Sequence, residues 1–499
     1  MGCTTILIGR KASYDGSTIV ARNEDSGNGS FVPKKLVVIH PDEQPRRYTS
    51  VLAHLSIDLP GDPLRYTAVP NALPDQGIWA EAGVNEANVA MSATETLTTN
   101  ERVLGADPLV RFEPSCGAAG EKGYTPERPG GLGEEDLVTV VLPYVRTARE
   151  GVRRLGGLLE TYGTYEMNGI AFSDADEIWW LETVGGHHWI ARRVPDDAYV
   201  TMPNQLGIDA FDLDDAEGEQ REHMASADLR AWMAKHHLDL TKDGDGSHFN
   251  PREAFGSHSD SDHVYNTPRA WYMQRYLNPH DLWDGPDASY GPESDDIPWC
   301  RESERLLTIE DVKYVLSSHY QGTPYDPYNP AGDERGKYRP IGINRNGQLA
   351  VLQIRPDMPA ANRALQWMAF GSNPFNALVP FYTQVDTMPD YVADTTGRVT
   401  TESHYWANRI IGALADARFH ETSSAIARYQ ERVGAKGHAL VHDTDGAVAG
   451  LDRSEAEQEL ARANKRMADA LQAETDALLG EVLFTVSLAM RNRFALSDA

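Results

Sequence analysis

The chain opens its first apolar run with Cys3-Thr4-Thr5-Ile6-Leu7-Ile8-Gly9, and a second run, Thr18-Ile19-Val20-Ala21-Arg22-Asn23-Glu24-Asp25, follows after Asp15-Gly16. The two runs predict buried strands, and Asp-Gly between them favours the positive backbone angles of a tight turn. We therefore expect a hairpin that returns Asp25 to the neighbourhood of the Cys3 sulfur, with Arg22 slightly short of it but long enough to reach. Arg22 and Asp25 are an odd number of residues apart and cannot share a face of a regular strand, so the strand must end or bulge between them.

Cys3 has an unusual chemical option. If Met1 and Gly2 are removed, one residue supplies both a nucleophilic sulfur and a free α-amino group, whose reference pKa is about 7.7–8.0. An amine of this kind can take the place of the histidine of a catalytic triad. The alternative is a small buried residue near a chain terminus.

Arg22 and Asp25 suit the surroundings of such a thiol. A guanidinium favours the thiolate over the thiol, and a carboxylate can hold and orient an α-ammonium group. The alternative is an Arg–Asp surface pair at the end of a hairpin, which most such pairs are.

With these residues in place, the sequence resembles the dipeptidase A family of cysteine N-terminal nucleophile hydrolases, relatives of penicillin V acylase and bile salt hydrolase. The Cys-Thr-Thr start, the Asp-Gly-Ser-Thr hairpin and Ala-Arg-Asn-Glu-Asp carry the resemblance most specifically. Further similar segments follow in order along most of the chain: 83–96, 147–152, 168–170, 179–183, 203–205, 265–269, 371–375 and 379–382.

The resemblance implies roles for five residues. Cys3 would be the nucleophile, with Arg22 and Asp25 as its supporting pair. Asn204 matches an asparagine that hydrogen-bonds in the oxyanion region of the acylase relatives, and Arg269 matches a further active-site arginine. No metal or organic cofactor is implied.

One position departs from the acylase pattern. Thr94-Glu95-Thr96 stands where the acylases place an Asn or Tyr oxyanion donor. A carboxylate cannot donate to an oxyanion, so the second donor stays unassigned; a backbone amide or a threonine hydroxyl can replace it. The departure motivates the hypothesis that Glu95 binds the free ammonium group of a substrate, against the alternative that it is a solvated surface residue.

Composition excludes several classes of function. The formal net charge is −28, from 74 acidic and 46 basic residues among 499, which opposes binding to nucleic acid or to anionic membrane. Three scattered cysteines neither form a disulfide framework nor have zinc-ligand spacing, and the sequence contains no His-Glu-x-x-His. No basic segment followed by an apolar stretch precedes the first strand, so we expect a cytoplasmic protein without a signal peptide.

The resemblance implies an α+β fold, a four-layer αββα sandwich with a helical C-terminal tail. We expect residues 1–2 to be a removed propeptide, 3–450 a catalytic domain with long loop insertions, and 451–499 a tail that packs on the domain or at a homo-oligomer contact. Loops are predicted at 113–133, 283–300 and 320–338, and strands at 169–172, 177–183 and 187–194. Helices are predicted over 134–162, interrupted by Pro143, and from Ser454 to about Arg491.

These expectations favour a dipeptidase that cleaves small dipeptides through a thioester on Cys3. Two alternatives stay open: an amidase of the same fold acting on N-acyl compounds such as penicillin V or conjugated bile salts, and a non-catalytic acidic interaction protein.

Overall fold

The computed structural model describes residues 2–27, 30–73, 77–242 and 249–490. Its largest element is an antiparallel sheet of seven strands in the order β14-β12-β1-β2-β15-β16-β17. The strands are β1 (Thr4–Ile8), β2 (Thr18–Asp25), β12 (Ala198–Met202), β14 (Cys300–Glu302), β15 (Asn346–Ile354), β16 (Ala364–Phe370) and β17 (Val379–Tyr382). The strand that follows Cys3 therefore lies in the interior of the sheet, with β12 on one side and β2 on the other.

A second antiparallel sheet has six strands in the order β13-β11-β10-β9-β8-β7. They are β7 (Ala82–Val84), β8 (Ala90–Thr96), β9 (Asn168–Ser173), β10 (Ile178–Thr183), β11 (Trp189–Arg193) and β13 (His223–Ala225). Two small two-stranded sheets pair β3 (Val37–Ile39) with β6 (Tyr66–Ala68) and β4 (Arg47–Thr49) with β5 (Ser56–Asp58). The two large sheets meet where β2 contacts β8 and β9.

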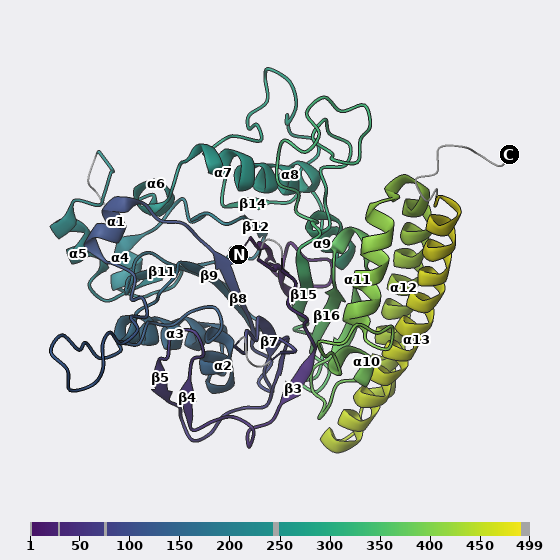
Figure 1. Ribbon diagram of the computed structural model, residues 1–499, viewed down its shortest axis with the longest axis horizontal. Helices are drawn as coiled ribbons and strands as arrows, with labels where there is room; N and C mark the ends of the chain where they lie inside the picture. Colours follow the sequence, from purple (N-terminus) through teal and green to yellow (C-terminus); the bar gives the residue numbers. More distant parts are fainter. Residues whose placement is uncertain (1, 28–29, 74–76, 243–248, 491–499) are drawn as a thin grey trace.

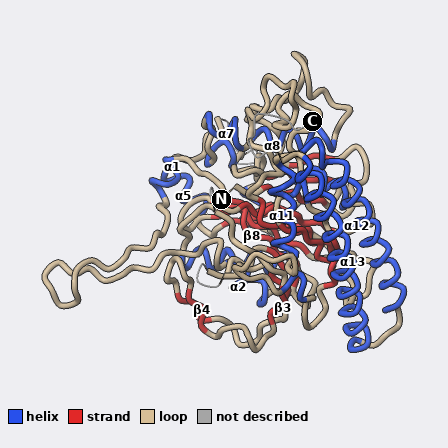
Figure 2. The backbone as a smooth tube through the Cα atoms, turned by 45° about the vertical axis from the view of Figure 1, so that its right-hand side comes forward, coloured by secondary structure: helices blue, strands red, loops and turns tan. Residues whose placement is uncertain are grey.

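Helices pack against both large sheets (Figure 1). The six-stranded sheet contacts α2 (Leu137–Val141) and α3 (Ala148–Tyr162). The seven-stranded sheet contacts α11 (His404–Asp416), α12 (Phe419–Val448) and α13 (Arg453–Leu488), which stand side by side in green and yellow in Figure 1 and in blue in Figure 2. The short helices are α1 (Glu101–Ala106), η2 (Leu142–Tyr144), α4 (Leu213–Glu217), α5 (Leu229–His236), α6 (Pro251–Phe255), α7 (Asp260–Tyr265), α8 (Thr267–Leu277), α9 (Ile309–Leu316), η3 (Asn373–Phe375) and α10 (Asp390–Ala393).

The predicted hairpin is present: β1 pairs antiparallel with β2, with Thr4 opposite Asn23 and Ile8 opposite Ile19. Gly16 has a φ of 77°, the left-handed conformation for which glycine is suited. The expected irregularity between Arg22 and Asp25 takes a different form, because β2 continues without a break through Asp25. The register instead shifts on the neighbouring strand β15, between Asn346 and Gln348.

Most of the secondary structure predicted from the sequence is confirmed. The three strands correspond to β9, β10 and β11, the interrupted helix to α2, η2 and α3, and the C-terminal helix to α13. The sequence does not predict α12. This helix contains Gly434, Gly437 and Gly446, each of which lowers intrinsic helix propensity, and it is stabilised by packing against α13 and β17.

Candidate active site

Cys3 immediately precedes β1, and its side chain is completely buried. The residue before it fits into a very small space: a Cβ atom added to Gly2 would lie 2.0 Å from the hydroxyl oxygen of Tyr265. Such a contact is far below van der Waals separation, so only glycine fits between Cys3 and this tyrosine without a shift. The chain is thus held closely on both sides of the Gly2–Cys3 peptide bond.

Arg22, on β2, reaches the sulfur. Its Nη1 donates a hydrogen bond to Cys3 Sγ at 3.2 Å, while Nη2 donates to the carbonyl oxygen of Ala93 at 2.6 Å and Nε to Ser92 Oγ at 3.2 Å. Strand register explains the meeting, because Arg22 lies opposite Thr5, and Thr5 and Cys3 share a face of the sheet.

The charge on Arg22 is retained inside the protein. Burial by itself would lower the pKa of this guanidinium, but the neighbouring Cys3, Glu81 and Glu134 raise it above its usual value. A permanent positive charge against the sulfur favours the thiolate form of Cys3.

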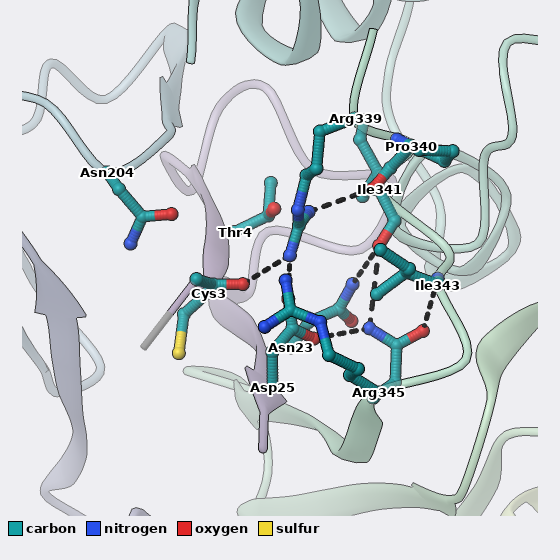
Figure 3. A network of polar contacts seen from close by, with 12 residues as sticks. Cys3, Thr4, Asn23, Asp25, Asn204, Arg339, Pro340, Ile341, Ile343 and Arg345 are labelled. Atoms are coloured by element: carbon teal, nitrogen blue, oxygen red, sulfur yellow. Dashed lines mark hydrogen bonds and ion pairs between the residues drawn. The ribbon is translucent and has the colours of Figure 1, made fainter. Parts of the chain in front are cut away.

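Asp25 lies on the amino-terminal side of Cys3, beside Arg339, an arginine that the sequence did not indicate. Arg339 donates to a carboxylate oxygen of Asp25 and also to the carbonyl oxygen of Gly2, and Asn346 Nδ2 donates to the second carboxylate oxygen at 2.5 Å. Figure 3 shows Asp25, Arg339 and Arg345 gathered on one side of Cys3, with Asn204 on the other. Arg339 follows the irregular segment 320–338, where no periodic pattern marks a site residue.

Arg269 joins Asn204 to the start of β1. It projects from the first turns of α8, is completely buried, and donates to the carbonyl oxygen of Cys3, to Thr4 Oγ1 at 2.7 Å and to Asn204 Oδ1 at 2.7 Å. Because Asn204 Oδ1 accepts from a guanidinium, its Nδ2 must point the other way, and it donates to the carbonyl oxygen of Thr96 at 2.9 Å. Arg22 thus contacts the Cys3 sulfur, Arg269 links the Cys3 carbonyl oxygen to Asn204, and Arg339 links Asp25 to the Gly2 carbonyl oxygen.

Glu95 lies in β8, where its backbone pairs with Gly169 of β9. Its side chain is outside the part of the chain that the structure describes, so its role in binding substrate stays a prediction.

Behind Arg22 lies a buried charge cluster that the sequence also did not indicate. Glu81 forms ion pairs with both Arg22 and Lys34, the latter at 3.2 Å. Lys34 also lies 3.8 Å from Glu24, and Arg22 lies 3.6 Å from Glu134. All five side chains are at least 98% buried, which is rare for ionised groups unless they are paired.

Among the residues that the structure describes, no group of three or more His, Cys, Asp or Glu side chains is arranged to hold a metal ion. In the same residues, no helix has the length and apolar character that crossing a membrane would require.

Comparison with known proteins identifies the family. The family model described as "Peptidase family C69" matches residues 2–432. The chain belongs to peptidase family C69. The match begins at the residue before Cys3 and includes every residue of the site described above.

Full-length relatives of this C69 peptidase carry consistent names. It is 62% identical to a protein named dipeptidase from Bifidobacterium longum (strain NCC 2705), with 100% of both chains covered. It is 55% identical to a probable dipeptidase A of Streptococcus pyogenes serotype M3, again with 100% of both chains covered. Dipeptidase A of Lactobacillus helveticus is 44% identical, with 96% of each chain covered.

Proposed function

We propose that this C69 peptidase is a dipeptidase that hydrolyses its substrate by acyl transfer through Cys3, after residues 1–2 have been removed. The observation that carries the proposal is the hydrogen bond from Arg22 Nη1 to Cys3 Sγ, at 3.2 Å, beside a backbone amide that removal of Gly2 would convert into a free amine. Family membership and the names of the full-length relatives support peptide hydrolysis and dipeptides as substrates.

The proposed reaction has two halves. The Cys3 thiolate attacks the peptide carbonyl, the C–N bond breaks, and the Cys3 α-ammonium group protonates the departing amino acid. The amine then takes a proton from water, and the resulting hydroxide cleaves the thioester, releases the second amino acid and restores the thiolate. Asp25 is suited to hold the ammonium group, because Arg339 contacts both Asp25 and the carbonyl oxygen of Gly2, whose carbon is bonded to the Cys3 nitrogen in the unprocessed chain.

Asn204 is the proposed donor to the oxyanion of the tetrahedral intermediate. Arg269 holds its Oδ1, and the amide is thereby oriented with Nδ2 as the donor end. A second donor remains unassigned. Loss of one oxyanion donor commonly lowers kcat by about a hundredfold to a thousandfold.

We also propose the fold of N-terminal nucleophile hydrolases, with residues 3–450 as the catalytic unit and 451–499 as its helical tail. Two antiparallel sheets in contact, with helices against each of them, support a four-layer αββα arrangement. Cys3 directly precedes an interior strand and so lies where the end of that strand meets the rim of the sheet. This position agrees with that of a nucleophile in such a sandwich.

Intact-protein mass spectrometry of the active enzyme tests the proposal first: the expected mature chain begins at Cys3. Cys3→Ala should abolish hydrolysis of alanylalanine, whereas Cys116→Ala, at an exposed cysteine, should leave it unchanged. An active preparation that retains Gly2, or an active Cys3→Ala variant, would refute the mechanism. Faster hydrolysis of penicillin V or of a conjugated bile salt than of alanylalanine would favour the amidase alternative.

A further inference from the structure

Three consecutive acidic residues, Glu134, Glu135 and Asp136, are all buried just before α2. The second and third have structural partners. Glu135 accepts hydrogen bonds from the backbone amides of Val51 and Leu52, at 3.2 and 2.6 Å. Asp136 accepts from the backbone amide of Gly133 at 2.9 Å and from the Tyr48 hydroxyl at 2.7 Å, so neither carboxylate needs a ligand.

Glu134 differs from both neighbours. Its side chain is 1% exposed, and its Oε1 accepts no hydrogen bond from the residues that the structure describes. Arg22 Nη1 lies 3.6 Å from this oxygen, which is an ion-pair distance but too long for a hydrogen bond. That nitrogen is the same one that donates to Cys3 Sγ at 3.2 Å. The sulfur and the carboxylate oxygen are therefore no farther apart than these two short distances added together.

Carboxyl groups outnumber basic groups in the surrounding cluster. Its two cations, Arg22 and Lys34, face three carboxylates, on Glu24, Glu81 and Glu134. A buried carboxylate without its own cation is costly. Burial, together with the neighbouring Glu81 and Glu166, raises the pKa of Glu134 to about 8, although Arg22 and the positive charge of the amino terminus act in the opposite direction. A cation that binds beside Oε1 would stabilise the ionised form of Glu134.

We propose that Glu134 binds the free α-ammonium group of the substrate and so restricts the enzyme to peptides with an unblocked N-terminus. This inference rests on the proposed function, because it names the substrate group that the Cys3 site recognises. It assigns to Glu134 the recognition of the ammonium group that the sequence suggested for Glu95.

Distances support the assignment. In a reactive complex the attacked carbonyl carbon lies about 3–3.5 Å from the sulfur. The α-nitrogen is two bonds from that carbon, at about 2.5 Å, and an ammonium–carboxylate hydrogen bond adds about 2.8 Å. Laid end to end, these steps reach about 8–9 Å. The two Arg22 contacts limit the distance between Cys3 Sγ and Glu134 Oε1 to the sum of their lengths, which is somewhat shorter than this extended path. A moderate bend in the bound substrate reduces the path to that distance.

Substrates that differ only in this group test the proposal on the unaltered enzyme. Lactoylalanine has a hydroxyl group where alanylalanine has its ammonium group, and N-acetylalanylalanine has a neutral amide. The mature enzyme should hydrolyse alanylalanine with a kcat/KM about a hundredfold higher than either analogue, since an unpaired buried carboxylate would face the neutral groups. Equal kcat/KM for alanylalanine and lactoylalanine would overturn the proposal without any variant.

Variants then assign the effect to Glu134. Glu134→Gln keeps the shape of the side chain but removes its charge, and should lower kcat/KM for alanylalanine about a hundredfold while changing that for lactoylalanine by no more than a few-fold. Glu134→Asp keeps the charge and should restore part of the preference. Glu135→Gln is the matched control, an equally buried neighbour whose partners are backbone amides, and should keep the wild-type ratio.

Two outcomes count against the proposal. A wild-type ratio in Glu134→Gln, or an equal loss towards both substrates, would show that Glu134 only supports Arg22. If Glu134→Gln does not fold, a preference for alanylalanine over N-acetylalanylalanine that Glu134→Asp keeps at least in part supports charge recognition, and complete loss of that preference overturns it. The proposed function fails separately, when Cys3→Ala retains activity or when the unaltered enzyme does not hydrolyse alanylalanine.

Discussion

Replacement of Arg339 by methionine should separate the stabilising role of its ion pair with Asp25 from its role in catalysis. Methionine retains an unbranched side chain but removes the guanidinium group. The ion pair is buried, with 6% of the Arg339 side chain and 0% of the Asp25 side chain exposed. Removal of Arg339 therefore leaves the Asp25 carboxylate in the protein interior without its cation.

The expected loss of stability follows from this burial. Removal of one partner of a buried ion pair typically costs about 3–5 kcal/mol. Asp25 keeps the hydrogen bond from Asn346 Nδ2, and such a bond to a charged group is worth about 1.5–3 kcal/mol. We therefore expect the lower end of the range, about 3 kcal/mol. Adding Asp25→Asn removes the unpaired charge and should restore about 2 kcal/mol of this loss.

Urea unfolding of the wild type, Arg339→Met, Asp25→Asn and the double variant measures these free energies, provided that the denaturant slopes agree. Hydrolysis of alanylalanine should not recover in the double variant, because asparagine carries no charge to hold the Cys3 ammonium group. Intact mass identifies any variant that has failed to lose Gly2. A loss below about 1 kcal/mol in Arg339→Met, or a double variant no more stable than the single one, would refute the reasoning.

Further predictions concern the oxyanion, the pH dependence of stability and metals. Asn204→Ala should lower kcat about a hundredfold or more with a smaller change in KM, and an unchanged kcat would remove Asn204 from the oxyanion site. Burial lowers the pKa of His404 to about 3, so the folded state binds fewer protons than the unfolded state between about pH 6.5 and 3, and stability is lost as the pH falls through this window. His404→Gln keeps an acceptor for Asn408 and should reduce this loss by up to about 1.4 kcal/mol per pH unit, as measured by urea unfolding at a series of pH values. If the free energy of unfolding falls with pH equally in the variant and the wild type, His404 is not responsible. Dialysis against EDTA should leave hydrolysis of alanylalanine unchanged, and activity restored only by added metal would contradict the mechanism.

The hairpin and the position of Arg22 could be predicted because they depend on local chain geometry. Alternating side chains and the turn at Asp15-Gly16 are sufficient to bring the second strand back to Cys3. The expectation of an irregularity in β2 is wrong, because the spacing of Arg22 and Asp25 does not specify which strand carries an extra residue. Gly347 of β15 supplies it: a Cβ atom there would lie 2.1 Å from Glu24 Oε2.

Asn204 and Arg269 were accessible from the sequence only through the family resemblance. They lie more than 60 residues apart, and their contact depends on how α8 packs against the end of β12. Arg339 and Glu134 carried no comparable signal. Arg339 directly follows a predicted loop and Glu134 is the first residue of a predicted helix, and a charged residue at either place is expected to be solvated.

The sequence by itself determined the hairpin that begins beside Cys3 and the reach of Arg22 to its sulfur, because these involve residues close together along the chain or across one turn. Only the tertiary structure decided which charges are removed from water around Cys3. Burial and long-range packing bring Arg339 to Asp25 and place Glu134 beside Arg22, which also pairs with Glu81. The energy of an ionised group depends on its distance from water and from other charges, and the order of residues along a chain specifies neither.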